Sequence, residues 1–161
     1  MPASDLYDFE VIVPVAVKGL LNAAGLNAWT IADTPDFQKV RPRVEVTYQH
    51  TGETSPRRAV KLDDGFKRAE AFNGELKLHA ITDADDPGKT AHSLYRATVR
   101  AFCATLGDLL NDGALPYHKL QWCEAGNEQT GVRTQDGYQQ TTFPFKILIS
   151  VQHDAWAQLS T

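Results

Sequence analysis

The stretch that decides the fold is Ala91-His-Ser-Leu-Tyr-Arg-Ala-Thr-Val-Arg-Ala-Phe-Cys-Ala-Thr-Leu-Gly-Asp-Leu-Leu110. Its apolar residues recur at intervals of three and four, which predicts one helix of roughly six turns. Turn residues Asp83–Thr90 precede it, and Asn111–Gly113 with Pro116 follow, so both ends are signalled. Alternating segments flank it, so we expect the helix to cover one face of a sheet. The expected buried stripe consists of Ala91, Leu94, Tyr95, Thr98, Val99, Phe102, Leu106, Leu109 and Leu110.

A first helix is predicted from Leu6 to Leu26, where apolar residues have the same spacing. Gly25 is expected to end it, and Pro14 either kinks it or marks where its regular part begins. The β-branched run from Val11 to Val17 leaves a strand as the competing interpretation.

Five further segments have the alternation or composition of strands. In the fourth, Leu120 and Trp122 are expected on one side. In the last, Pro144 suggests an edge position near the start of the strand. The segments are Ala28–Ile31, Arg43–Tyr48, Glu75–Ala80, Tyr117–Cys123 and Phe143–Val151.

Two polar connections interrupt this pattern. Residues 49–65 are predicted to form a protruding loop or an extended hairpin with weak pairing from Ala59 to Leu62, and residues 124–140 a long hairpin region. The predicted fold class is therefore α+β, as a single domain of residues 1–161. It has a mixed, mostly antiparallel sheet with two main helices on one face, in the order α-β-β-β-α-β-β.

The composition excludes several classes of protein. The 161 residues fit one domain, and 16 basic against 20 acidic residues give a net charge of −4, without the cationic signature of a nucleic-acid binder. Cys103 and Cys123 are too few for a disulfide framework, which favours a reduced cytoplasmic protein. The longest apolar run, from Val11 to Val17, is too short to span a membrane.

No motif for catalysis, a cofactor or a metal is expected. Gly88-Lys-Thr90 lies between a strand and a helix, but it lacks the earlier glycine of a phosphate-binding loop and follows three aspartates that would repel a phosphate. Those aspartates also lack the ligand spacing of a calcium loop. The five histidines have no metal-binding spacing, and a nucleophile turn of the Gly-x-Ser-x-Gly type is absent from the sequence.

A basic cluster remains, because eight of the sixteen cations fall between Lys39 and Arg68. It is either a solvated face, a contact with an acidic neighbouring subunit, or a contact with passing nucleic acid. Arginines in the first polar connection and acids in or beside the second could meet head to tail between copies, a contact that can close into a ring. The candidate subunit-interface residues are Arg57, Arg58, Lys61, Glu124, Glu128 and Asp136.

Five segments follow one another along the chain: Leu20–Asn27, Arg41–Val46, Leu76–Ala80, the Ala91–Leu110 helix with its Asn-Asp-Gly exit, and the closing hairpin from Gly137 to Val151. This plan resembles the tail terminator, or tail completion, proteins of long-tailed bacteriophages. The resemblance implies a mixed α/β fold and a hexameric ring that caps the tail tube, ends its polymerisation and joins the head-side connector (stopper) protein. It also implies no catalytic residues and no cofactor.

Partners and location follow from the same resemblance. They are further copies of the chain, the tail tube protein and the connector, with DNA passing through the ring without sequence-specific binding and no membrane contact. The expected location is the tail or neck of the virion, and the host cytoplasm during assembly. Alternative interpretations are another neck or minor tail protein of a phage, or a small cytoplasmic enzyme or ligand-binding domain whose site has no visible motif.

Overall fold

The structure is a computed structural model that describes residues 8–30, 41–54, 59–62, 65–83, 90–111, 115, 118–133 and 137–152. Its helices are α1 (Phe9–Ala23), α2 (Thr90–Cys103) and α3 (Leu106–Leu109). Its strands are β1 (Ala28–Thr30), β2 (Arg43–Thr54), β3 (Ala59–Leu62), β4 (Gly65–Asp83), β5 (His118–Ala125), β6 (Gln129–Arg133) and β7 (Tyr138–Gln152).

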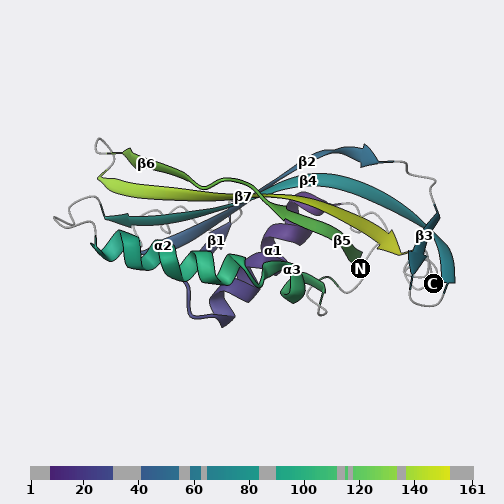
Figure 1. The fold of residues 1–161 in the computed structure, drawn as a ribbon, viewed down its shortest axis with the longest axis horizontal. Helices are drawn as coiled ribbons and strands as arrows, with labels where there is room; N and C mark the ends of the chain where they lie inside the picture. Colours follow the sequence, from purple (N-terminus) through teal and green to yellow (C-terminus); the bar gives the residue numbers. More distant parts are fainter. Residues whose placement is uncertain are drawn as a thin grey trace.

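All the strands belong to one sheet, with the main order β1-β2-β4-β7-β5, while β3 pairs with β4 and β6 with β7. Every pair is antiparallel except β1 with β2. The three helices lie on the same side of the sheet (Figure 1). Along the main path the chain runs α1-β1-β2-β4-α2-β5-β7, which confirms the predicted α+β class and the order α-β-β-β-α-β-β.

Helix α1 buries one stripe against the sheet, formed by Phe9, Val13, Val17 and Leu21. The helix continues through Pro14, so the competing strand interpretation of this segment is wrong. It ends at Gly25 as predicted. Gly25 has a φ of 85°, and the N–H of Leu26 donates to the carbonyl of Leu21 at 3.1 Å, the closing bond of a glycine-terminated helix.

The predicted single helix from Ala91 to Leu110 is wrong, because it is broken between α2 and α3. Ala104 and Thr105 form a turn at this point. Both the amide and the hydroxyl of Thr105 donate to the carbonyl of Phe102, at 3.0 and 2.9 Å. A threonine side chain that bonds the backbone nearby competes with the helical ladder, and this competition accounts for the break.

The buried stripe of α2 is also narrower than predicted. Val99 is fully buried and Phe102 is 8% exposed, but Leu94 is 65% exposed, so its place in the stripe is wrong. The stripe begins instead at the buried His92. Leu94 lies two residues later, roughly 200° further around the helix, and so faces away from the sheet.

The outer strand β5 contains an irregularity that reverses its faces. Leu120 pairs with Ile149 and Trp122 with Leu148, so Gln121 is an extra residue in the ladder. An extra residue turns the following side chains to the other face. Leu120 is therefore buried while Trp122 is 42% exposed, and the prediction that they share one side is wrong.

Strand β7 is central rather than an edge strand, which corrects the expectation drawn from Pro144. It pairs with β4 on one side and with β5 and β6 on the other. Proline has no N–H to donate, but Pro144 faces the gap between β5 and β6, where the ladder is interrupted. Its carbonyl still accepts the N–H of Gly126, at 2.8 Å.

Gly74 in β4 makes room for the ring of Tyr48, and this close approach gives a testable prediction. A Cβ at position 74 would lie 1.9 Å from the Tyr48 hydroxyl oxygen. We expect Gly74→Ala to lower the free energy of unfolding by about 1–3 kcal/mol, as overpacking of a core does. Urea denaturation measures this change.

Gly19 in α1 provides the matched control, because a Cβ there meets nothing within 4 Å. Gly19→Ala should raise the free energy of unfolding by roughly 0.5–1 kcal/mol, the usual gain in a helix interior. Equal stability of Gly74→Ala and the wild type would contradict the packing of Tyr48 on the Gly74 backbone.

Candidate assembly surfaces

Parts of the polar connection of residues 49–65 are strands in the described structure, while residues 55–58 and 63–64 lie outside the described residues. Strand β2 continues to Thr54, which pairs with Ala71, and β3 then pairs with the start of β4. β7 ends opposite Ala69 of β4, so the pairing of residues 59–62 with 65–68 lies beyond the end of β7. These two paired segments lie at the right-hand end of Figure 1.

The acidic connection lies on the edge of the sheet that β5 and β6 form beside β7. β5 and β6 pair one after the other with β7, and residues 126–128 separate them. β6 and the start of β7 form a hairpin in which Arg133 pairs with Tyr138. The predicted hairpin region of residues 124–140 thus contains the end of β5, all of β6 and the start of β7.

Three of the candidate interface residues can be placed in the fold. Lys61 belongs to β3 and pairs with Phe66 of β4, beyond the end of β7, whereas Glu124 and Glu128 lie on the β5–β6 edge. A head-to-tail contact between copies needs two different surfaces. Arg57, Arg58 and Asp136 lie outside the described residues.

Glu128 is already bound within its own chain. Its two carboxylate oxygens accept hydrogen bonds from Arg100 of α2, one of them at 2.7 Å to Nη2. These bonds, and then the charges of Arg100 and Arg96, lower the pKa of Glu128, while the same bonds raise the pKa of Arg100. The pair fastens α2 to the segment between β5 and β6, a contact that sequence spacing did not reveal.

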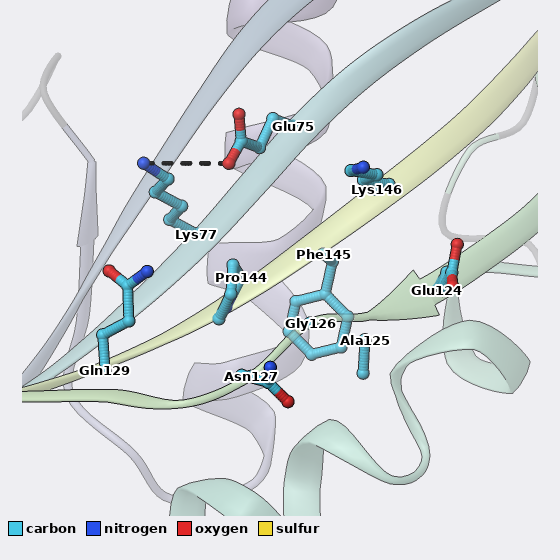
Figure 2. A pocket seen from close by; sticks show the side chains of 10 residues that line it. All are labelled: Glu75, Lys77, Glu124, Ala125, Gly126, Asn127, Gln129, Pro144, Phe145 and Lys146. Carbon is cyan, nitrogen blue, oxygen red and sulfur yellow. Dashed lines mark ion pairs between the residues drawn. The ribbon is translucent and has the colours of Figure 1, made fainter.

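Glu124 lines a shallow pocket on the sheet face opposite the helices, with a volume of about 330 Å³ (Figure 2). β4 contributes Glu75 and Lys77, whose side chains approach to 3.8 Å, and β7 contributes Lys146. Two glutamates and two lysines give the lining no net formal charge.

A second cavity lies between α1 and the α2–α3 pair, with a volume of about 440 Å³. Its polar side chains are limited to Thr98 and Thr105, so it fits an apolar side chain better than a polar substrate. The lining consists of Leu20, Ala23, Ala24, Leu26, Thr98, Phe102, Thr105 and Leu109.

The histidines in the described residues occupy structural positions. His92 is buried between Thr82 and Thr141, with ring nitrogens 2.8 and 2.9 Å from the two hydroxyls. His79 contacts Thr47 and Thr142 on the open face of the sheet. His50 and His118 both pack on Phe9, while His153 lies outside the described residues.

The two thiols are poorly suited to nucleophilic chemistry. Burial raises the pKa of Cys103 to about 12 and also raises the pKa of Cys123. A thiolate is the reactive form of cysteine, so a raised pKa disfavours a role as nucleophile for either side chain.

No helix within the described ranges is long and apolar enough to cross a membrane. In the same part of the chain, no group of three or more histidine, cysteine, aspartate or glutamate residues is arranged to hold a metal ion. Residues 84–89, which include most of the rejected phosphate-loop sequence, lie outside the described residues.

Comparison with known proteins gives a likeness of fold. No protein-family profile and no curated protein sequence matches the chain. A chain of the virion of a native gene transfer agent particle aligns with a TM-score of 0.53 and 13% identity, over 89% of this chain and 98% of that one. A second solved chain aligns with a TM-score of 0.41 and 15% identity, over 88% and 94%, and carries no argument.

Proposed function

We propose that this chain is a structural protein of a phage-like particle, and within that particle a tail terminator. The observation that carries the proposal is the fold likeness to a virion chain, which extends over 98% of that chain. The sequence resemblance to tail terminators, noted above, points independently to the same kind of particle.

In this role, copies of the chain form a closed ring, proposed to be a hexamer, on the end of the tail tube. The ring stops addition of tube subunits on one side and binds the head-side connector on the other, while DNA passes through without base recognition. The protein acts by occupying a surface, so it requires neither a catalytic group nor a cofactor. Its place is the tail or neck of the virion, reached from the host cytoplasm during assembly.

Charged residues of opposite sign support head-to-tail contact in this ring, because basic residues are concentrated in one segment of the sequence and acidic residues lie in another. The proposed contact joins the basic segment of one copy, with Arg57, Arg58 and Lys61, to the acidic edge of the next, with Glu124, Glu128 and Asp136. Complementary charges steer association and fix its orientation more than they add affinity.

Arg57→Glu combined with Arg58→Glu tests the charged contact. We expect this variant to form rings more weakly and to give longer tails in an assembly reaction, because repulsion replaces attraction between copies. The thermal melt of the monomer should be nearly unchanged. Light scattering over a concentration series and electron microscopy of protein mixed with tail tubes provide the measurements.

The control variant is Lys18→Glu with Lys89→Glu, which changes the net charge equally outside the proposed contact. It should cap tubes as the wild type does. Normal capping by the arginine variant would exclude the basic segment from the ring contact. If wild-type protein never associated with tube ends, the terminator function would be wrong, and binding elsewhere on the particle would indicate another neck or minor tail protein.

A further inference from the structure

The sheet has two outer edges without a strand neighbour in the described part of the chain. On one side, β1 pairs with β2 only at Val44–Val46, so the stretch from Thr47 to Thr54 has β4 as its sole strand neighbour there. On the other side, β5 has only β7. Backbone groups along such edges are templates for pairing with another chain.

These two edges lie at the same height along the strands. The pairing register runs across the sheet from Gln49 to Glu75, then to Lys146 and to Glu124. Further along the strands, the pairings across the sheet align Thr54 with Lys119 in the same way. The eight residues of β5 and the eight residues from Thr47 to Thr54 therefore occupy nearly the same segment of the sheet.

The strand directions also suit a contact between copies. β2 and β7 run one way, while β4 and β5 run the other. When copies are related by rotation about an axis along the strands, β5 of one copy meets β2 of the next in antiparallel orientation, the slightly more stable arrangement. A closed ring allows no rise from one copy to the next, and edges at equal height satisfy that condition.

The composition of the β2 edge leaves it open to pairing. Natural edge strands are commonly protected by lysine or proline, and Thr47–Thr54 contains neither. β5 contains Lys119 and the extra residue Gln121, and the register of β2 shifts close to the same level, between His50 and Gly52. On β5, the 42% exposed Trp122 lies at the height of Gly52. An aromatic ring packs well over a glycine on a neighbouring strand, so a second copy would cover this tryptophan.

We infer that β5 of one copy pairs antiparallel with the Thr47–Thr54 stretch of β2 in the next, joining the sheets of successive copies around the ring. This inference rests on the ring of the proposed function. It places Glu124 of one copy directly opposite Gln49 of the next. Of the two acids of the charged contact that the structure describes, Glu124 falls within the paired stretch, whereas Glu128 lies beyond it, towards the level of β1. Lys61 pairs with Phe66, nine residues along β4 from Glu75, which is the level of Glu124, so this strand pairing is an alternative to the charged contact between Lys61 and Glu124 within the same proposed ring.

Disulfide trapping tests the register. In a background with Cys103→Ser and Cys123→Ser, the pair Gln49→Cys and Glu124→Cys should cross-link on mild oxidation with copper phenanthroline into a series of oligomers ending at the closed ring. The protein is used at its highest soluble concentration and again on tail tubes, with circular dichroism to verify folding. Each single-cysteine variant should remain uncross-linked.

The control for position along the strands places the second cysteine at Gln129 instead of at Glu124. Gln129 pairs with Thr142, which is four residues along β7 from Lys146, the residue aligned with Gln49. Gln49→Cys with Gln129→Cys should give no oligomers. Dimers from Glu124→Cys alone would mean that two β5 strands pair with each other, and absence of oligomers from the test pair would mean that these edges do not meet. Either result overturns the inference.

Charge substitution provides a second readout with the native cysteines present. Gln49→Glu should weaken self-association by up to about fivefold per contact, because like charges would stand opposite each other, and Glu124→Lys should restore it. An unchanged association constant contradicts the pairing. Cross-linked rings that never cap tubes would support this strand pairing and refute the terminator function. Tube capping without cross-linking would support the terminator function and refute the strand pairing.

Discussion

Phe102→Ala is expected to lower the free energy of unfolding by about 3–5 kcal/mol, the usual cost of removing a buried aromatic side chain. Phe102 is 8% exposed and belongs to the main hydrophobic core, where α2 packs on the sheet. Truncation removes its apolar contacts and enlarges the cavity between α1 and the α2–α3 pair, which Phe102 lines. Urea denaturation monitored by circular dichroism measures the loss.

Leu94→Ala on the same helix is the matched control. Leu94 is 65% exposed, so its truncation should change the free energy of unfolding by no more than about 0.5 kcal/mol. The apolar spacing of the sequence predicts both residues in one buried stripe, so the comparison tests directly which face of α2 packs on the sheet. A loss below about 1 kcal/mol for Phe102→Ala would mean that this residue is exposed in the monomer.

His92→Leu is expected to have the second-largest effect, a loss of about 2–3 kcal/mol, because two buried hydroxyls lose their hydrogen bonds to the imidazole ring. His92 joins α2 to two strands of the sheet, through Thr82 of β4 and Thr141 of β7. All three side chains are buried. Replacing only the histidine keeps an apolar side chain of similar size but removes both hydrogen bonds to its ring.

The triple variant Thr82→Val, His92→Leu and Thr141→Val separates hydrogen bonding from packing. Replacing all three side chains by apolar ones removes both sides of the two ring–hydroxyl hydrogen bonds, so the triple variant should be more stable than His92→Leu alone. Urea denaturation of both variants gives the comparison. A triple variant that is less stable than the single one would show that shape, rather than hydrogen bonding, makes His92 important.

The class of the fold could be predicted from the sequence because its signals are local. Alternation along β2, β4 and β7, and three- and four-residue spacing along α1, each depend on neighbours within a few residues. Features that depend on one residue's hydrogen bonds were missed. The Thr105 hydroxyl breaks the long helix, and the extra residue Gln121 turns Trp122 outward, but neither changes the hydrophobic pattern.

The candidate site was only partly predictable, because its geometry depends on strand order. The sequence indicated a basic and an acidic segment, but the location of Glu124 on an outer edge of the sheet follows from pairings between distant strands. Arg100 and Glu128 are 28 residues apart, and no spacing rule relates a helix to an edge strand at that separation. The equal heights of β5 and β2 likewise appear only once three strand registers are known.

The central place of β7 has a consequence for how the chain acquires its structure during synthesis. β4 pairs with β2, which precedes it closely in the sequence. Its other neighbour, β7, comes much later and ends at Gln152, opposite Ala69. At ribosomal speeds of about 5–20 residues per second, β7 emerges on the order of several seconds after β4. Until then one side of β4 has no strand beside it. Slow long-range pairing of this kind exposes nascent chains to aggregation, so yield in the host should depend on chaperones more than the stability of the finished sheet suggests.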